Sequence, residues 1–86
     1  MSIKLIAYDL HQPGQNYDLL SFIKTFPYAQ LSESSYAVKC QMPPDELYNG
    51  LSQYLDKNDQ LLILTLSKPM AGQGFGNVVD WLEQHL

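Results

Sequence analysis

The chain has 86 residues, of which 45% are hydrophobic and only 16% are charged. This length predicts one domain, residues 1–86, and the charged fraction lies below the roughly 25% of typical soluble domains. Its single cysteine, Cys40, excludes an internal disulfide and a two-cysteine zinc or redox motif, which fits a reducing compartment. The start lacks a secretory leader pattern and no apolar run approaches the ~18 residues that span a bilayer, so we expect a cytoplasmic protein without a membrane partner.

The charge balance argues against one class of partner. Five lysines stand against nine acidic residues, the net charge is −4, and the chain has no arginine. Nucleic-acid surfaces concentrate lysine and arginine, because both release counterions from the phosphate backbone. Binding of nucleic acid is therefore doubtful for this acidic chain.

The first predicted element is a strand from Ile3 to Asp9, in which Leu5 faces one side and Ile6 and Tyr8 face the other. The strand ends at Asp9, and the polar stretch "HQPGQN" follows. A carboxylate at this position either binds a divalent metal or caps the turn by accepting hydrogen bonds from backbone N–H groups.

Two further polar residues lie near Asp9. His11 would project to the same side as Asp9 if the strand continued, as a pair of metal ligands does, but Pro13 and Gly14 favour a polar loop instead. Asp18 is expected in the first turn of the next helix, where it serves the helix dipole. A metal role for Asp18 is the alternative.

The middle of the chain predicts a helix, two strands and a second helix. Asn16 is expected to cap the first helix, Pro27 to end it, and Pro44 to stand at the start of the second. The two strands cover residues 28–31 and 35–41 and join around "SES". The apolar faces of the two helices comprise Leu19, Phe22, Ile23 and Phe26 in the first and Leu47, Leu51, Tyr54 and Leu55 in the second.

The last third begins with "QLLILTLS", a strand too apolar for burial on one side only. A glycine-rich loop, "KPMAGQGFGN", leads to a final helix that Asn77 is expected to cap. Trp81 and Leu82 lie on the apolar face of this helix, and Trp81 is expected to be largely buried by the sheet or by a neighbouring subunit. Because the glycines lack the spacing of phosphate-binding loops, a flexible connector is the favoured interpretation.

This order of elements is the split βαβ pattern. It predicts an α+β fold, a ferredoxin-like βαββαβ sandwich with an antiparallel sheet plus a C-terminal helix. The first and third strands should be central. Since the first and last strands are apolar on both faces, either the C-terminal helix or a second copy of the chain should cover the second face of the sheet.

Several motifs resemble those of known families. "LIAYDL" at the end of the first strand and "LSESSYAV" at the third are similar to the small CRISPR-associated endonuclease that partners the spacer integrase. "YDLHQPGQNY", "NDQL" and the final "WL" resemble SinR-like short bacterial proteins over nearly the whole chain. VapD-type ferredoxin-like ribonucleases are more distant relatives.

The resemblance implies a homodimer in which Asp9 matches the metal ligand of the CRISPR-associated family, one from each subunit. Two functions follow as hypotheses. The favoured one is a non-catalytic dimeric module of the SinR-like group that binds a protein partner or supports an assembly. The alternative is a metal-dependent endonuclease, a ribonuclease or deoxyribonuclease, that uses Asp9 as catalytic and metal-binding residue with Mg²⁺ or Mn²⁺. Whether the protein is an enzyme therefore stays open at this point.

Overall fold

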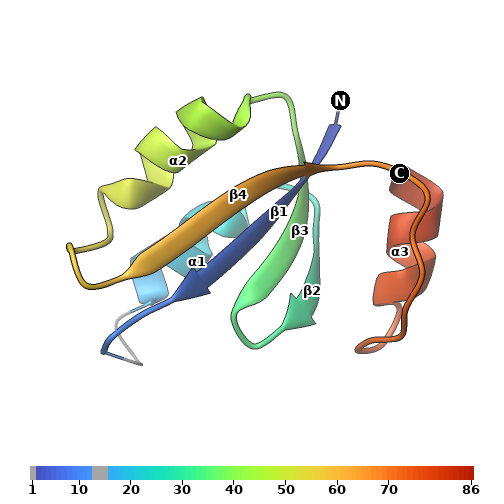
Figure 1. Ribbon diagram of the computed structural model, residues 1–86, viewed down its shortest axis with the longest axis horizontal. Coiled ribbons are helices and arrows are strands. Elements are labelled where there is room, and N and C mark those ends of the chain that lie inside the picture. Colours follow the sequence, from blue (N-terminus) through green and yellow to red (C-terminus); the bar gives the residue numbers. More distant parts are fainter. Residues whose placement is uncertain (1, 13–15) are drawn as a thin grey trace.

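The computed structural model describes residues 2–12 and 16–86, so residues 13–15 of the predicted "HQPGQN" turn lie outside the described part of the chain. The described residues form a small α+β structure with one four-stranded antiparallel sheet and three helices (Figure 1). In chain order the elements are β1 (Ser2–Asp9), α1 (Tyr17–Ile23), β2 (Tyr28–Ser32), β3 (Ser35–Cys40), α2 (Pro44–Ser52), β4 (Gln60–Leu66) and α3 (Val78–His85). None of these helices has the length and apolar character needed to cross a membrane.

The strand order in the sheet is β2-β3-β1-β4, and every neighbouring pair is antiparallel. The two strands expected at the centre, β1 and β3, are central. Ile6 in the middle of β1 lies between Tyr36 of β3 and Ile63 of β4. Both edges of β1 are therefore hydrogen-bonded to neighbouring strands, and its residues from Ile3 to Tyr8 are apolar except for Lys4.

Helices α1 and α2 pack on one face of the sheet, where the main core forms. Ile6 and Tyr8 supply the β1 side of this core. The helices contribute Leu19 and Ile23 from α1 and Leu47 and Leu51 from α2, and each of these four is at most 1% exposed. The helical spacing therefore predicts these four buried residues correctly, whereas Tyr54, assigned to the same face of the second helix, follows the end of α2 and is 37% exposed.

Helix α3 packs on the opposite face of the sheet, at the β2 side (Figure 1). Val78 and Leu82 of α3 bury themselves against Ile3, Ala29 and Ala37. These sheet residues are small or lie near one end of β1, so the helix can approach the strands closely. The expectation that the C-terminal helix covers the second face is therefore met on part of that face.

The structure corrects the predicted helix ends. Helix α1 ends at Ile23, and not at Pro27, because the following residues turn, with the Phe26 N–H donating to the Ile23 carbonyl oxygen at 3.2 Å. Asn16 and Asn77 do precede α1 and α3, but neither side chain makes a capping hydrogen bond. Both have ψ near 0°, whereas a capping residue normally has an extended backbone.

Within the single chain the sheet buries Trp81 only in part, and its burial by a second subunit stays a prediction. Leu82, the next residue, is 8% exposed and belongs to the buried cluster under α3, while Trp81 packs against that cluster and stays partly exposed. The indole ring stacks on the His85 ring with 4.2 Å between ring centroids. The helix is rotated so that Val78 and Leu82 face the sheet, which leaves Trp81 at the side of the contact.

Candidate functional site

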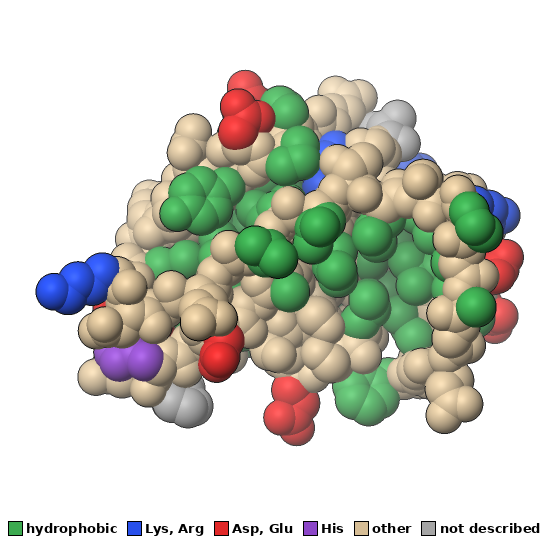
Figure 2. All heavy atoms as spheres, in the orientation of Figure 1, with side chains coloured by type: hydrophobic (Ala, Val, Ile, Leu, Met, Phe, Trp, Pro, Cys, Tyr) green, Lys and Arg blue, Asp and Glu red, His purple; other side chains and the backbone are tan. Residues whose placement is uncertain are grey.

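Part of the second sheet face remains uncovered next to α3. Leu62 and Leu64 of β4 are 62% and 44% exposed, which is unusual for leucines in a strand. Leu5 and Ala7 of β1 pair with them across the strands and lie on the same face. We call these four residues the open half-face. Figure 2 shows hydrophobic side chains gathered over the middle of this side of the molecule.

Asp9 lies at the end of the open half-face. Alternation along β1 puts Asp9 on the same side as Leu5 and Ala7, and the residue is exposed and pairs with Gln60 of β4. In the described part of the chain, no hydrogen bond reaches its carboxylate. Because residues 13–15 lie outside that part, the predicted capping of the "HQPGQN" turn is not tested, and both interpretations of Asp9 stay predictions.

A histidine and two carboxylates meet just beyond the end of β1. The Asp59 Oδ1 atom accepts from the His11 backbone N–H at 3.0 Å and lies 2.7 Å from the His11 Nδ1 atom. The Asp59 Oδ2 atom accepts from the Asp56 N–H at 3.0 Å. The Asp59 side chain is only 10% exposed, so this carboxylate joins the end of β1 to the turn between α2 and β4.

Asp56 completes this cluster from the other side of the imidazole ring. Its Oδ1 atom accepts from the Asn58 N–H at 2.8 Å. Its Oδ2 atom lies 3.4 Å from the His11 Nε2 atom. The potential ligand atoms of His11, Asp56 and Asp59 all lie within 4.8 Å of one another, so these residues form the candidate metal-binding cluster among the described residues.

The hydrogen bonds shift the pKa values of the cluster in opposite directions. The pKa of Asp59 is lowered to about 2, first by the Asp56 backbone N–H and then by the His11 side chain and backbone N–H. The pKa of His11 is raised, chiefly because its ring bonds to Asp59, with smaller Coulombic contributions from Asp56 and Asp59. Each shift favours the charged form, so the imidazolium of His11 and the carboxylate of Asp59 stabilise one another.

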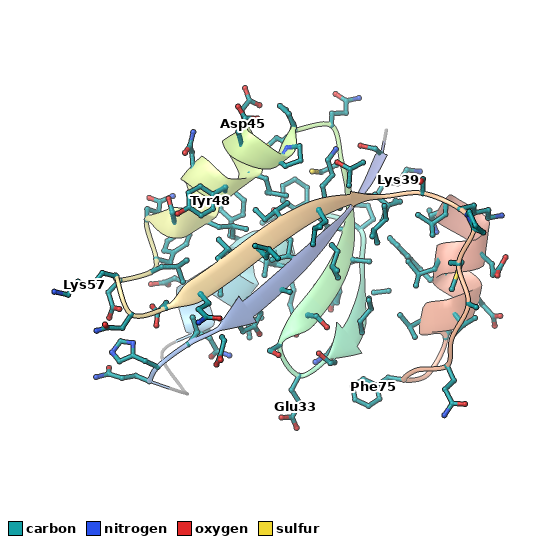
Figure 3. All side chains as sticks on the ribbon, in the orientation of Figure 1. Glu33, Lys39, Asp45, Tyr48, Lys57 and Phe75 are labelled. Atoms are coloured by element: carbon teal, nitrogen blue, oxygen red, sulfur yellow. The ribbon has the colours of Figure 1, made fainter. Side chains whose placement is uncertain are left out.

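Two hollows flank the cluster. The larger, about 650 Å³, follows the β4 side of the molecule and includes Asp9, Tyr48, Asp56 and Asp59 in its lining. The smaller, about 330 Å³, lies toward α1 and includes Asp18 as well as the three cluster residues. Lys57 also lines the larger hollow, and in Figure 3 its labelled side chain extends from the turn away from the molecule.

In the sequence an Asp9–His11 metal pair is only the alternative to a polar loop, and in the structure His11 has different partners. His11 contacts Asp59 and Asp56, which are 48 and 45 positions away in the chain, and the cluster does not include Asp9. The backbone leaves the strand after Asp9, so the alternation that would align Asp9 with His11 no longer applies. The signal that was missed is "DKND", whose two aspartates sit in the turn before β4.

Comparison with known proteins informs the fold only. No protein-family model matches the sequence, and no curated protein is significantly similar to it. The structure is similar to the crystal structure of a hypothetical protein from Thermus thermophilus, with a TM-score of 0.67 and 18% sequence identity. The match covers 85% of this chain and 93% of that one. It therefore supports the small α+β architecture.

Proposed function

We propose that this chain is a homodimeric, non-catalytic assembly module whose subunits meet through the open half-face. The observation that carries the proposal is the exposure of Leu62 and Leu64 on a sheet face that α3 covers only in part. Exposed apolar groups in contiguous patches mark interaction sites. We also propose that this dimer binds a protein partner or supports a larger assembly.

A second copy of the chain is the occupant that the open half-face favours. Its four residues carry no charge, so the surface offers no ionic pattern for selecting a different partner. A two-fold axis places the same patch on both sides of an interface, and leucine side chains pack well against leucine. A standard interface covers about 800 Å² per partner, which is about one seventh of the 5547 Å² surface of the chain.

The proposal also includes the finer class of the fold. The order β2-β3-β1-β4, with α1 and α2 on one face, supports a ferredoxin-like sandwich with an added helix α3. This class agrees with the resemblance to the SinR-like proteins and to the small CRISPR-associated endonuclease. A dimer in which the uncovered sheet faces meet is a natural assembly for such a fold.

A metal-dependent endonuclease is the second candidate function, and the position of Asp9 favours it. Two open half-faces that meet would bring two exposed Asp9 carboxylates to the same interface, and Mg²⁺ binds readily to one or two carboxylates with water and phosphate oxygens. The absence of arginine and the net charge of −4 weigh against it, because little is left to hold a phosphate backbone. Cleavage of RNA or DNA with Mg²⁺ or Mn²⁺, lost in Asp9→Asn, would establish this function instead.

The mass of the wild-type protein in solution tests the proposed dimer. Light scattering at tens of micromolar should give twice the 9.8 kDa mass of the chain. The wild type should not cleave RNA or DNA with either metal ion. A mass of one chain at that concentration would remove the basis of the proposal.

A further inference from the structure

Outside the open half-face, the His11 Nε2 atom and the Asp56 Oδ2 atom form the strongest feature without an assigned role. They are 3.4 Å apart, which exceeds the ~2.7–3.2 Å of an ordinary N–H···O hydrogen bond. Two ligand atoms that each lie ~2.0–2.1 Å from a tetrahedral Zn²⁺ ion are about 3.4 Å from one another. The spacing is therefore that of two neighbouring metal ligands.

The other polar side-chain atoms of His11 and Asp56 already have hydrogen-bond partners, which leaves His11 Nε2 and Asp56 Oδ2 for a metal ion. Asp59 Oδ1 holds the His11 Nδ1 position at 2.7 Å, and Asn58 N–H donates to Asp56 Oδ1. A carboxylate on Nδ1 fixes the histidine tautomer in which Nε2 carries the lone pair, as it does in many zinc sites. The Nε2 lone pair of His11 then faces the Oδ2 atom of Asp56, and a cation between these two atoms can accept electron density from both.

The surroundings of this pair suit a cation. The His11 and Asp56 side chains are 35% and 54% exposed, so water can complete the coordination sphere. Asp18 of α1 lines the same 330 Å³ hollow and adds a third carboxylate, while none of the lysines contributes to its lining. The ligands come from the segment after β1 and from the α2–β4 turn, which the Asp59 hydrogen bonds hold in register.

We infer that His11 Nε2 and Asp56 form a binding site for a borderline divalent metal ion such as Zn²⁺, with Asp59 as a positioning residue. Imidazole nitrogen together with carboxylate oxygen is a ligand set that Zn²⁺ accepts, whereas Mg²⁺ prefers oxygen alone. The site lies beyond Asp9 and uses none of the open half-face. A test of this metal site is therefore independent of the tests of the proposed dimer and of the endonuclease alternative.

Calorimetric titration of the chelator-treated full chain with ZnCl₂ at pH 7.5 tests the site. We expect saturable binding that His11→Gln and Asp56→Asn abolish, and that Asp59→Asn weakens roughly 10–100-fold, the usual effect of removing a carboxylate behind a metal-bound histidine. Asp45→Asn is the matched control, because it removes the same charge at the far end of α2 and should leave the affinity unchanged (Figure 3). Circular dichroism confirms that each variant is folded.

A paramagnetic probe locates the ion independently of these variants. Co²⁺ added to the wild type should broaden the ring signals of His11 in NMR spectra before those of His85, which stacks on Trp81 in α3. Three outcomes overturn the inference: no binding at millimolar Zn²⁺, equal loss of affinity in Asp45→Asn, or first broadening at His85. Each of these would leave the cluster as a hydrogen-bonded ion pair only.

Discussion

Asp59 shows how one side chain can organise two distant segments. Each of its oxygens accepts a hydrogen bond from a backbone N–H group, one from His11 and one from Asp56. The carboxylate therefore links the end of β1 to the α2–β4 turn. Charge-assisted hydrogen bonds of this kind are stronger than neutral ones. These hydrogen bonds, together with the one to the His11 side chain, lower the pKa of Asp59 to about 2, so its carboxylate stays charged over the whole physiological pH range.

The pKa of His11 gives the first prediction at this scale. In metal-free protein, an NMR titration of the His11 ring should give a pKa above the ordinary 6.5, because the hydrogen bond to Asp59 favours the imidazolium. The contribution of this bond to stability is present below pH 6.5 and is lost as the pH rises through the raised pKa. Asp59→Asn should move the pKa back down, and an unchanged value in that variant would contradict the assigned cause.

Lys4 is a residue whose burial the sequence does not indicate. It is 3% exposed, and its ammonium donates to the Cys40 carbonyl oxygen at 3.1 Å and to the Ser2 hydroxyl. Lysines are almost never fully buried without a partner, and here Ser2 of β1 and Cys40 of β3 stand opposite one another at the same end of the strand pair. Cys40 itself is a buried free cysteine, as expected for a small apolar residue in a core strand.

At the scale of elements, the position of α3 on the sheet depends on the loop that connects it to β4. The loop between β4 and α3 is mostly exposed, and Gly76, just before the helix, has φ of +47°. Residues other than glycine pay a steric penalty in this left-handed region, with asparagine among the more tolerant. The glycine-rich composition predicted a connector, but only the structure reveals why glycine is needed: Gly72 also has a positive φ, of +155°, and a Cβ at Gly74 would lie 2.6 Å from the Val78 Cγ1 atom.

Substitution at Gly76 tests this requirement. Gly76→Ala should lower the free energy of unfolding by roughly 1–2 kcal/mol, because an added Cβ meets no neighbour but the backbone is strained. Gly76→Asn should cost less. Chemical denaturation measures both variants, and equal stability of Gly76→Ala and the wild type would show that the loop adopts another backbone in solution.

Helix α2 offers a prediction about the main core. Leu51 is 0% exposed, so Leu51→Ala should lower the free energy of unfolding by about 2–5 kcal/mol through lost burial and the cavity left behind. Tyr48, one turn earlier, is 47% exposed and gives the comparison. A smaller loss in Leu51→Ala than in Tyr48→Ala, measured by urea denaturation, would contradict the orientation of α2.

At the scale of the whole molecule, the sequence predicts the elements better than the sites. Apolar periodicity identifies all four strands and three helices, because burial imposes a period of two on strands and 3.6 on helices. The His11 cluster could not be predicted, since His11 is 45 or more positions away from both aspartates and the pairing of β1 with β4 brings the two segments together. The apolar residues on both faces of β4 predicted that its second face needs cover, but could not indicate how far α3 extends over it.

The central claim is that the open half-face joins two copies of the chain, and a pair of glutamate substitutions in β4 tests it most directly. Leu64 points to the open half-face, whereas the exposed neighbour Thr65 points to the opposite side. Both Leu64→Glu and Thr65→Glu add the same charge to the same strand, and they place it on opposite faces of the sheet.

Sedimentation equilibrium at tens of micromolar provides the measurement, with circular dichroism to confirm folding and Leu62→Glu as a second variant on the same face. The wild type and Thr65→Glu should have twice the 9.8 kDa mass of the chain, while Leu64→Glu and Leu62→Glu should have the mass of one chain, because a buried carboxylate without a partner opposes association. A dimer that persists in folded Leu64→Glu and Leu62→Glu, or a wild type that is a single chain, would contradict the claim.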